Sequence, residues 1–369
     1  MAEWGVATRG RAFVVERPLF TVVLLIGIGL AVDLVHGLYT GRIPFSTLST
    51  FFWDGILTGL ILGLAGIGLS MTYSILNFAN FSHGDLVTAG AFSGWAVTYV
   101  VAGFGVVEFG SLVLVRADGG APPGELGINV AETSVAIVLG LLGAVVLTIL
   151  VALVIDRLVY RRMREDSGIS LLIASIGVAL VLRYLIAFVF GARSRGVTAN
   201  VPSVDVIPFV QDFGVVNAHK LTLMIVALAL MLGVHLLVQR TKLGTAMRAM
   251  ADNKDLALVT GIPTERVVLW TWIIGAGLTG AAGYLIVLQR GAMDFNLGWG
   301  LLLLIFAAVI LGGIGSIYGA IGGGLIIGLA STLSIIWIPA DFAVAAAFLL
   351  MILVLVFKPA GLFSGVTTA

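Results

Sequence analysis

The sequence contains no cysteine and little charge. Without a thiol, disulfide bonds, thiolate metal sites and cysteine nucleophiles are excluded. Charged residues make up 11% of the chain and hydrophobic residues 60%, whereas an ordinary soluble domain carries roughly 25% charge. Because a water-exposed surface needs more charge than this, the composition predicts an integral membrane protein.

Motifs that would supply chemistry are also missing. No lysine follows a glycine, which excludes a Walker A phosphate loop. The sequence has no histidine pair at metal-binding spacing and no nucleophile elbow, so neither an enzyme nor a cofactor site is expected. The net charge of +1 and the lack of a long basic run argue against nucleic acid as a partner. Energy for any active transport must therefore come from another polypeptide or an ion gradient.

Long apolar runs predict the membrane-spanning helices. At about 20 residues per crossing, the chain has room for about 8–10 spans. The predicted fold is therefore all-α, a polytopic transmembrane helical bundle in the lipid bilayer. We expect the spans at residues 19–38, 55–76, 86–103, 133–155, 169–190, 221–239, 267–289, 298–313, 317–335 and 341–357.

The distribution of lysine and arginine predicts the orientation of the bundle. Four arginines lie within residues 157–164, and a second basic connection covers residues 240–266. The N-terminus is also basic, and Lys358 follows the last span. Alternating crossings place all four regions on one side, which the positive-inside rule makes cytoplasmic. Both termini are thus expected in the cytoplasm, and the connections at 119–127 and 191–220 outside it.

A polar stretch interrupts the apolar pattern at residues 74–85. It contains Asn77, Asn80, His83 and Asp85 between two apolar segments. Polar groups at membrane depth are costly, so they usually face a cavity or one another. One interpretation is a broken helix whose exposed backbone binds a polar solute. The other is a cytoplasmic turn in which Asn80 or Ser82 is the N-cap of the next helix. Spacing alone leaves both open.

Single charged or titratable residues within the other spans also have two interpretations each. Arg183 lies about two-thirds of the way through its span, where it would either contribute to a transport pathway or extend to the interface. Asp33 is expected to reach the outer interface. His235, close to the cytoplasmic boundary, is expected to have a structural role.

The connection at 240–266 has the pattern of an amphipathic helix on the cytoplasmic face. A helix over residues 244–259 would place Arg248, Asp252 and Lys254 in water, and Gly261 would end it. It would lie in the headgroup layer or dock into a soluble partner. The residues expected on its apolar side are Met247, Met250, Ala251, Leu256 and Val259.

Four motifs in the same order suggest a family. Asn80-Phe81-Ser82-His83-Gly84-Asp85 resembles the Asn-Phe-Ala-His-Gly-Glu signature of the branched-chain amino acid ABC transporter permeases. The stretch from Arg248-Ala249 through Ala257 to Gly261-Ile262 is similar to the family's cytoplasmic coupling segment. Residues 308–319 resemble its late motif, with Tyr318 in place of the usual Pro, and residues 358–363 its C-terminal ending. Ser82 and Asp85 replace the usual Ala and Glu.

The resemblance implies a subunit of a larger complex in the cell membrane of a prokaryote. Residues 55–363 would form the permease domain, preceded over 1–54 by a cytoplasmic stretch and an extra transmembrane helix. Two ATP-binding-cassette ATPase subunits, a second permease subunit and an extracytoplasmic solute-binding protein would be its partners. The solutes of the family are branched-chain or other amino acids, amides and urea.

The resemblance also assigns roles to individual residues. Asn77, Asn80, His83, Asp85 and Arg183 are expected in the translocation pathway. The ATPase is expected to bind the coupling segment through Arg248, Ala249, Asp252, Ala257, Gly261 and Ile262. Two alternatives remain: an ion-coupled secondary transporter with His83 and Asp85 as its proton or cation site, and a passive channel for a small neutral solute.

Overall fold

The computed structural model describes residues 18–106, 124–199, 203–205 and 215–363. Nine helices within these residues are long and apolar enough to cross a membrane, which confirms the predicted all-α polytopic bundle. The α-helices are α2 (Pro18–Tyr39), α3 (Phe45–Leu76), α4 (Ser82–Gly103), α5 (Ser134–Leu158), α6 (Gly168–Phe190), α7 (Ala218–Arg240), α8 (Lys242–Asp252), α9 (Lys254–Val259), α10 (Thr264–Arg290), α11 (Leu297–Gly312), α12 (Ile317–Leu333) and α13 (Ala343–Phe357).

Short elements complete the architecture. Three 3₁₀ helices are present in the described residues: η2 (Tyr160–Met163), η3 (Ser334–Ile336) and η4 (Ala340–Phe342). Strand β1 (Arg195–Gly196) pairs antiparallel with β4 (Ala292–Met293), and β2 (Ser203–Asp205) pairs antiparallel with β3 (Val215–Asn217). The β1–β4 pair joins the segment after α6 to the segment after α10.

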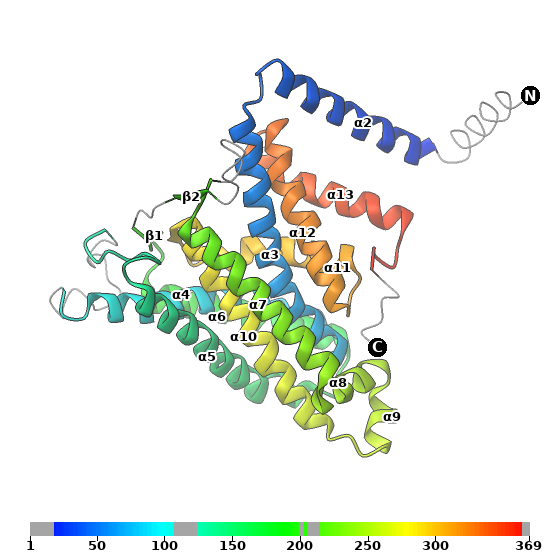
Figure 1. Ribbon diagram of the computed structural model, residues 1–369. Coiled ribbons are helices and arrows are strands. Elements are labelled where there is room, and N and C mark those ends of the chain that lie inside the picture. Colours follow the sequence, from blue (N-terminus) through cyan, green and yellow to red (C-terminus); the bar gives the residue numbers. More distant parts are fainter. Residues whose placement is uncertain (1–17, 107–123, 200–202, 206–214, 364–369) are drawn as a thin grey trace, which may run out of the picture.

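Helices α3 and α10 form the centre of the bundle. In both, 89% of the most apolar 18-residue window is buried. Figure 1 shows α3 running through the middle of the molecule, between α7 and α10 on one side and α11 and α12 on the other. The α3–α12 contact depends on glycine, because a Cβ added to Gly59 would lie 2.7 Å from the Cα of Leu325. Small residues at such positions allow helix backbones to approach closely in lipid.

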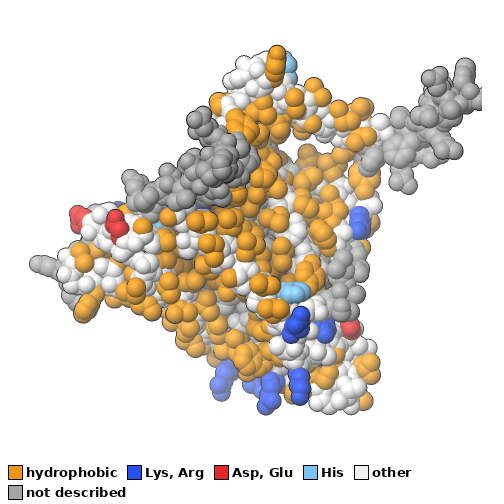
Figure 2. Space-filling view, in the orientation of Figure 1, with side chains coloured by type: hydrophobic (Ala, Val, Ile, Leu, Met, Phe, Trp, Pro, Cys, Tyr) orange, Lys and Arg blue, Asp and Glu red, His pale blue; other side chains and the backbone are white. Residues whose placement is uncertain are grey.

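The surface has an apolar belt with basic residues at one end. Large apolar side chains are exposed along the outer helices, among them Val138, Val181 and Leu232. In Figure 2 the Lys and Arg side chains gather along the lower edge, around α8 and the lower ends of the long helices. Exposed apolar side chains of this number suit contact with lipid tails.

Two of the expected spans differ from the helices. The span expected at 55–76 begins at Phe45, because Asp54 is accommodated inside α3 by the Nζ of Lys220, 2.5 Å from its Oδ1. The span expected at 298–313 is α11, a helix of 16 residues. At 1.5 Å per residue α11 is about 24 Å long, shorter than the hydrocarbon core of about 30 Å.

The N-terminal helix α2 stands apart from the bundle. Only 6% of its apolar window is buried, and in Figure 1 it lies at the top of the molecule, above α13 and outside the central helices. Its C-terminal end is attached through the Asp33 carboxylate, whose Oδ2 accepts hydrogen bonds from Arg42 Nη2 at 2.6 Å and from Trp337 Nε1 at 2.9 Å. Nearly all of α2 is therefore left for lipid or another subunit to cover.

Candidate functional site

The polar stretch at 74–85 is a break between two helices. α3 ends at Leu76 and α4 begins at Ser82. Asn77 turns the chain with a left-handed φ of 55°, a conformation that asparagine adopts more readily than most residues. The N-cap of α4 is Phe81, but the Asn80 side chain satisfies the start of the helix, because its Oδ1 accepts a hydrogen bond from the Ser82 backbone N at 3.1 Å.

The break is enclosed by protein. Asn80 and Ser82 are fully buried, and the hydroxyl of Tyr160 donates to Asn80 Oδ1 at 3.2 Å and lies 2.8 Å from Ser82 Oγ. The Phe81 backbone N donates to Ser175 Oγ of α6 at 3.0 Å. Residue Asn77, by contrast, is exposed at the end of α3. Contacts from η2 and α6 thus hold the break in place.

His83 lies where α3, α4 and α10 cross. Its Nε2 is 2.9 Å from the backbone oxygen of Ala65 and 3.3 Å from Thr279 Oγ1. A carbonyl oxygen can only accept, so Nε2 carries the proton that it donates to Ala65. The neighbouring crossing of α3 and α10 is backbone on backbone, because a Cβ on Gly68 would lie 2.6 Å from the oxygen of Gly275.

Asp85 and Arg183 form a buried ion pair between α4 and α6. Arg183 Nε donates to Asp85 Oδ1 and Nη2 donates to Oδ2, both at 3.0 Å, in a bidentate arrangement. The Asp85 side chain is completely buried and that of Arg183 is 9% exposed. The guanidinium carbon also lies 4.3 Å from the ring centroid of Trp299 in α11. Arg183 therefore points into the protein, which rules out the interpretation that it extends to the interface.

The first turn of α4 thus presents three polar side chains to four neighbouring elements. Ser82 contacts Tyr160 of η2, His83 contacts α3 and α10, and Asp85 contacts α6. Four of the five residues expected in the pathway, all except Asn77, meet around this turn. No local pattern in the sequence pointed to Tyr160, Ser175 or Trp299, since their contacts join distant segments.

The coupling segment consists of two helices, so the single helix expected over 244–259 is wrong. α8 ends at Asp252 and α9 begins at Lys254, with Asn253 between them. The Asn253 side chain caps α9 by accepting from the Leu256 backbone N at 2.9 Å. Because the chain changes direction at Asn253, the two helices do not share one apolar face.

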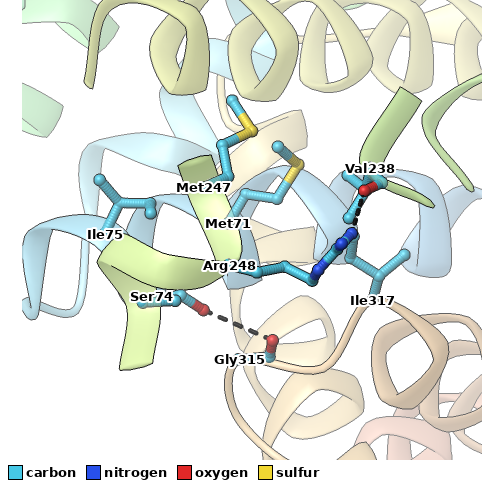
Figure 3. A pocket seen from close by; sticks show the side chains of 9 residues that line it. Met71, Ser74, Ile75, Val238, Met247, Arg248, Gly315 and Ile317 are labelled. Atoms are coloured by element: carbon cyan, nitrogen blue, oxygen red, sulfur yellow. Dashed lines mark hydrogen bonds between the residues drawn. The ribbon is translucent and has the colours of Figure 1, made fainter. Parts of the chain in front are cut away.

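α8 is anchored on its own bundle. Met247 and Met250 are buried, as expected for the apolar side. Figure 3 shows Met247 close to Met71 of α3, at a cavity of about 40 Å³ that Arg248 and Ile317 also line. Arg248 does not face water as expected: its Nη1 donates to the backbone oxygen of Val238, near the end of α7.

Unlike α8, helix α9 exposes its large apolar side chains. Leu256, Leu258 and Val259 are exposed, with 84% of Val259 accessible. Only Ala257 is buried. After α9 the chain turns at Gly261, whose φ is 84°, and the Ile262 backbone N donates to the oxygen of Ala257 at 3.0 Å. The expectation that Leu256 and Val259 share one apolar side with the methionines is wrong, because α9 turns them outward. Ala251 belongs to α8 and lines the same cavity as Met247.

Comparison with known proteins agrees with this geometry. The family model described as "Branched-chain amino acid transport system / permease component" matches residues 51–357. This chain belongs to that family. It is therefore a multi-pass protein of the cell membrane and a permease subunit of an ATP-binding-cassette importer.

Curated relatives of this permease cover most of its length. The high-affinity branched-chain amino acid transport system permease protein LivH of Escherichia coli (strain K12) is 28% identical over 311 residues, 84% of this chain and 93% of LivH. BraD of Pseudomonas aeruginosa, a permease protein of the same description, is 26% identical over 310 residues, 84% of this chain and 93% of BraD. A probable LivH of Methanocaldococcus jannaschii is 28% identical over 287 residues, 76% of this chain and 79% of the relative. The search of solved structures gave no significant match.

The late motif of the permease, residues 308–319, lies beside the coupling segment, since Gly315 and Ile317 line the same cavity as Arg248. It covers the end of α11 and the start of α12, and the Ser74 hydroxyl of α3 donates to the Gly315 oxygen within it at 3.4 Å (Figure 3). Tyr318 contacts His235 of α7, with 2.6 Å between the hydroxyl and Nδ1. A tyrosine at this position therefore supplies a partner for His235, in agreement with the structural role expected for that histidine.

Proposed function

We propose that this permease is one of two membrane subunits that import branched-chain or related amino acids, driven by two separate ATPase subunits and supplied by an extracytoplasmic binding protein. The observation that carries the proposal is the coupling segment. It is anchored to the bundle through α8 and leaves the apolar side chains of α9 exposed. Apolar side chains so placed suit a protein partner, and the sequence itself has no phosphate loop.

The anchoring of α8 supports a mechanical role. Met247 lies beside Met71 and Ile75 near the end of α3, only a few residues before the Asn77 turn (Figure 3). A displacement of α8 by the ATPase would thus act on the end of α3 and on the break that follows. The ATPase would drive transport by binding one arrangement of these helices more tightly than the other.

The buried polar residues at the start of α4 support a pathway near the break. Asp85 and Arg183 are paired with each other and would shape the pathway rather than bind the solute. We propose that these residues, with Asn77, Asn80 and His83, shape the pathway near the break. The Nδ2 of Asn80 is a buried donor without a hydrogen-bond partner in the described part of the chain, and so is available to a solute.

The same contacts weigh against an ion-coupled secondary transporter. In the described structure, His83 Nε2 is committed to the Ala65 oxygen and both oxygens of Asp85 are committed to Arg183. A proton or cation site made from His83 and Asp85 would have to break these bonds.

The orientation is part of the proposal. The basic connection after α5, the coupling segment and Lys358 would all face the cytoplasm, and the basic edge in Figure 2 supports this placement. The start of the chain, at residues 1–17, and most of the outer connection at 119–127 lie outside the described residues.

The test is ATP-dependent uptake by the purified complex in liposomes, comparing Val259→Asp with the matched Val259→Ile. The charge on α9 should remove binding of the ATPase subunits and uptake, whereas isoleucine should preserve both. Uptake by this chain alone, driven by an ion gradient and indifferent to ATP, would contradict the proposal. If Asn80→Ala and His83→Ala both transport normally, the pathway assignment fails but the importer assignment stands.

A further inference from the structure

A charged cavity lies beside the start of α10. Its volume is about 270 Å³. It is formed by the end of α5, the connection that follows it, and the first two turns of α10. The residues that line it are Asp156, Arg161, Arg164, Glu265, Arg266 and Leu269.

The three arginines of the cavity differ in how they are paired. Arg164 is paired with both carboxylates, since its Nη2 lies 2.9 Å from Asp156 Oδ2 and its Nη1 donates to Glu265. Arg161 is paired only loosely, with 3.6 Å between its Nε and Glu265 Oε2 and both side chains about 60% exposed. Arg266 has no ion-pair partner among the described residues. Three guanidinium groups therefore face two carboxylates. Arg161 and Arg266, which Asp156 does not engage, can donate hydrogen bonds to an anion.

The surroundings of the cavity place it at the boundary between lipid tails and headgroups. Leu269, which lines it, is 43% exposed, and the adjacent Trp270 is 41% exposed. On α5, Val154 and Leu158 are exposed as well. The cavity thus has a charged wall and an apolar margin, with a tryptophan at the level that this residue favours in membranes. A soluble anion would need only the charged wall.

We propose that this cavity binds the phosphate of an anionic phospholipid, with Arg161 and Arg266 as its contacts and Leu269 beside the acyl chain. Asp156 and Glu265 hold Arg164 in the wall of the cavity. The positive charges of Arg161 and Arg266 are then directed at the lipid phosphate. Basic pockets between transmembrane helices on the cytoplasmic side are suited to such headgroups. The inference goes beyond the proposed function and takes from it only the side of the membrane.

The experiment measures lipid retention by the purified full-length chain in native mass spectrometry, with phosphatidylglycerol and phosphatidylcholine added in turn. The double variant Arg161→Gln/Arg266→Gln should weaken phosphatidylglycerol binding on the order of tenfold, and leave phosphatidylcholine unchanged. Arg240→Gln/Lys242→Gln is the matched control, since both residues are exposed basic groups, at the end of α7 and the start of α8, that do not line the cavity. Arg161→Lys/Arg266→Lys retains the charge and should retain most of the binding.

Three outcomes would overturn the proposal. The first is unchanged phosphatidylglycerol binding in the glutamine variant. The second is displacement of the lipid by inorganic phosphate at equal concentration, which would assign the site to a soluble anion. The third is loss of ATPase co-purification with lipid binding intact, which would assign the cavity to the ATPase contact. Because the lipid measurement involves no transport, its failure is distinct from failure of the importer proposal.

Discussion

The break between α3 and α4 and the coupling segment α8–α9 are two polar interruptions in a largely apolar chain, and they differ in where their side chains are directed. At the break, Asn80, His83 and Asp85 are each bonded to another part of the same chain. In the coupling segment, only α8 has such contacts, and the apolar residues of α9 are exposed. The side chains at the break hold helices of this chain together, whereas the apolar side chains of α9 are left exposed for a partner. Similar polarity in a sequence can therefore serve opposite purposes.

The largest effect is expected from opening the buried pair at the break. Arg183→Met leaves the Asp85 carboxylate buried without its partner, which should cost about 3–5 kcal/mol of stability. The measurement is thermal or denaturant unfolding of the purified chain in detergent. The double variant Asp85→Leu/Arg183→Met removes both charges and should recover most of the loss. Equal instability of the single and double variants would show that packing of α4 on α6, and not charge, matters here.

A smaller effect on stability, but a large one on coupling, is expected in α8. Arg248→Glu removes the donor to the Val238 oxygen and places a carboxylate beside that acceptor. The fold should persist because Met247 and Met250 remain buried. Uptake per ATP hydrolysed should fall on the order of tenfold, since a bond from a charged donor is worth about 1.5–3 kcal/mol. Arg248→Lys keeps the charge as a control, and normal uptake by the glutamate variant would remove Arg248 from the coupling route.

The smallest effect is expected from a single hydroxyl at the break. Tyr160→Phe removes the contacts to Asn80 and Ser82 but keeps the ring stacked on Trp272, whose centroid is 5.4 Å away. The loss should be about 1 kcal/mol in the free energy of unfolding. The measurement is the same unfolding assay, with Tyr184→Phe as the control because Tyr184 is an exposed tyrosine in α6. A loss no larger than that of the control would mean that Asn80 holds the break without Tyr160.

The sequence predicted the bundle and most span positions because lipid imposes a simple requirement, a long apolar helix for each crossing. It also located the break, since four polar residues within nine positions depart from that requirement. The partners of those residues were not predictable. Asp85 is 98 positions from Arg183, and Asn80 is 80 positions from Tyr160, so no local pattern connects them.

Two local predictions failed for a different reason. The coupling segment has a helical pattern across residues 244–259, yet Asn253 caps a second helix and turns the apolar side of α9 outward. Asparagine is both a weak helix former and a strong cap, and only the position of the neighbouring helices decided between these roles. The start predicted for α3 at residue 55 was too late, because Asp54 lies inside the helix and pairs with Lys220 of α7. Tertiary contacts determined both outcomes.

The glycines at the contact of α3 and α12 limit how this protein can move. A Cβ on Gly324 would lie 2.5 Å from the backbone N of Gly63, and one on Gly328 would lie 2.4 Å from the backbone N of Gly59. Successive turns of the two helices therefore interlock along more than one turn, and a sliding motion would force backbone into backbone. We therefore expect α3 and α12 to move together as one rigid unit. Any hinge used in the transport cycle should lie at the ends of this helix pair and not along its length.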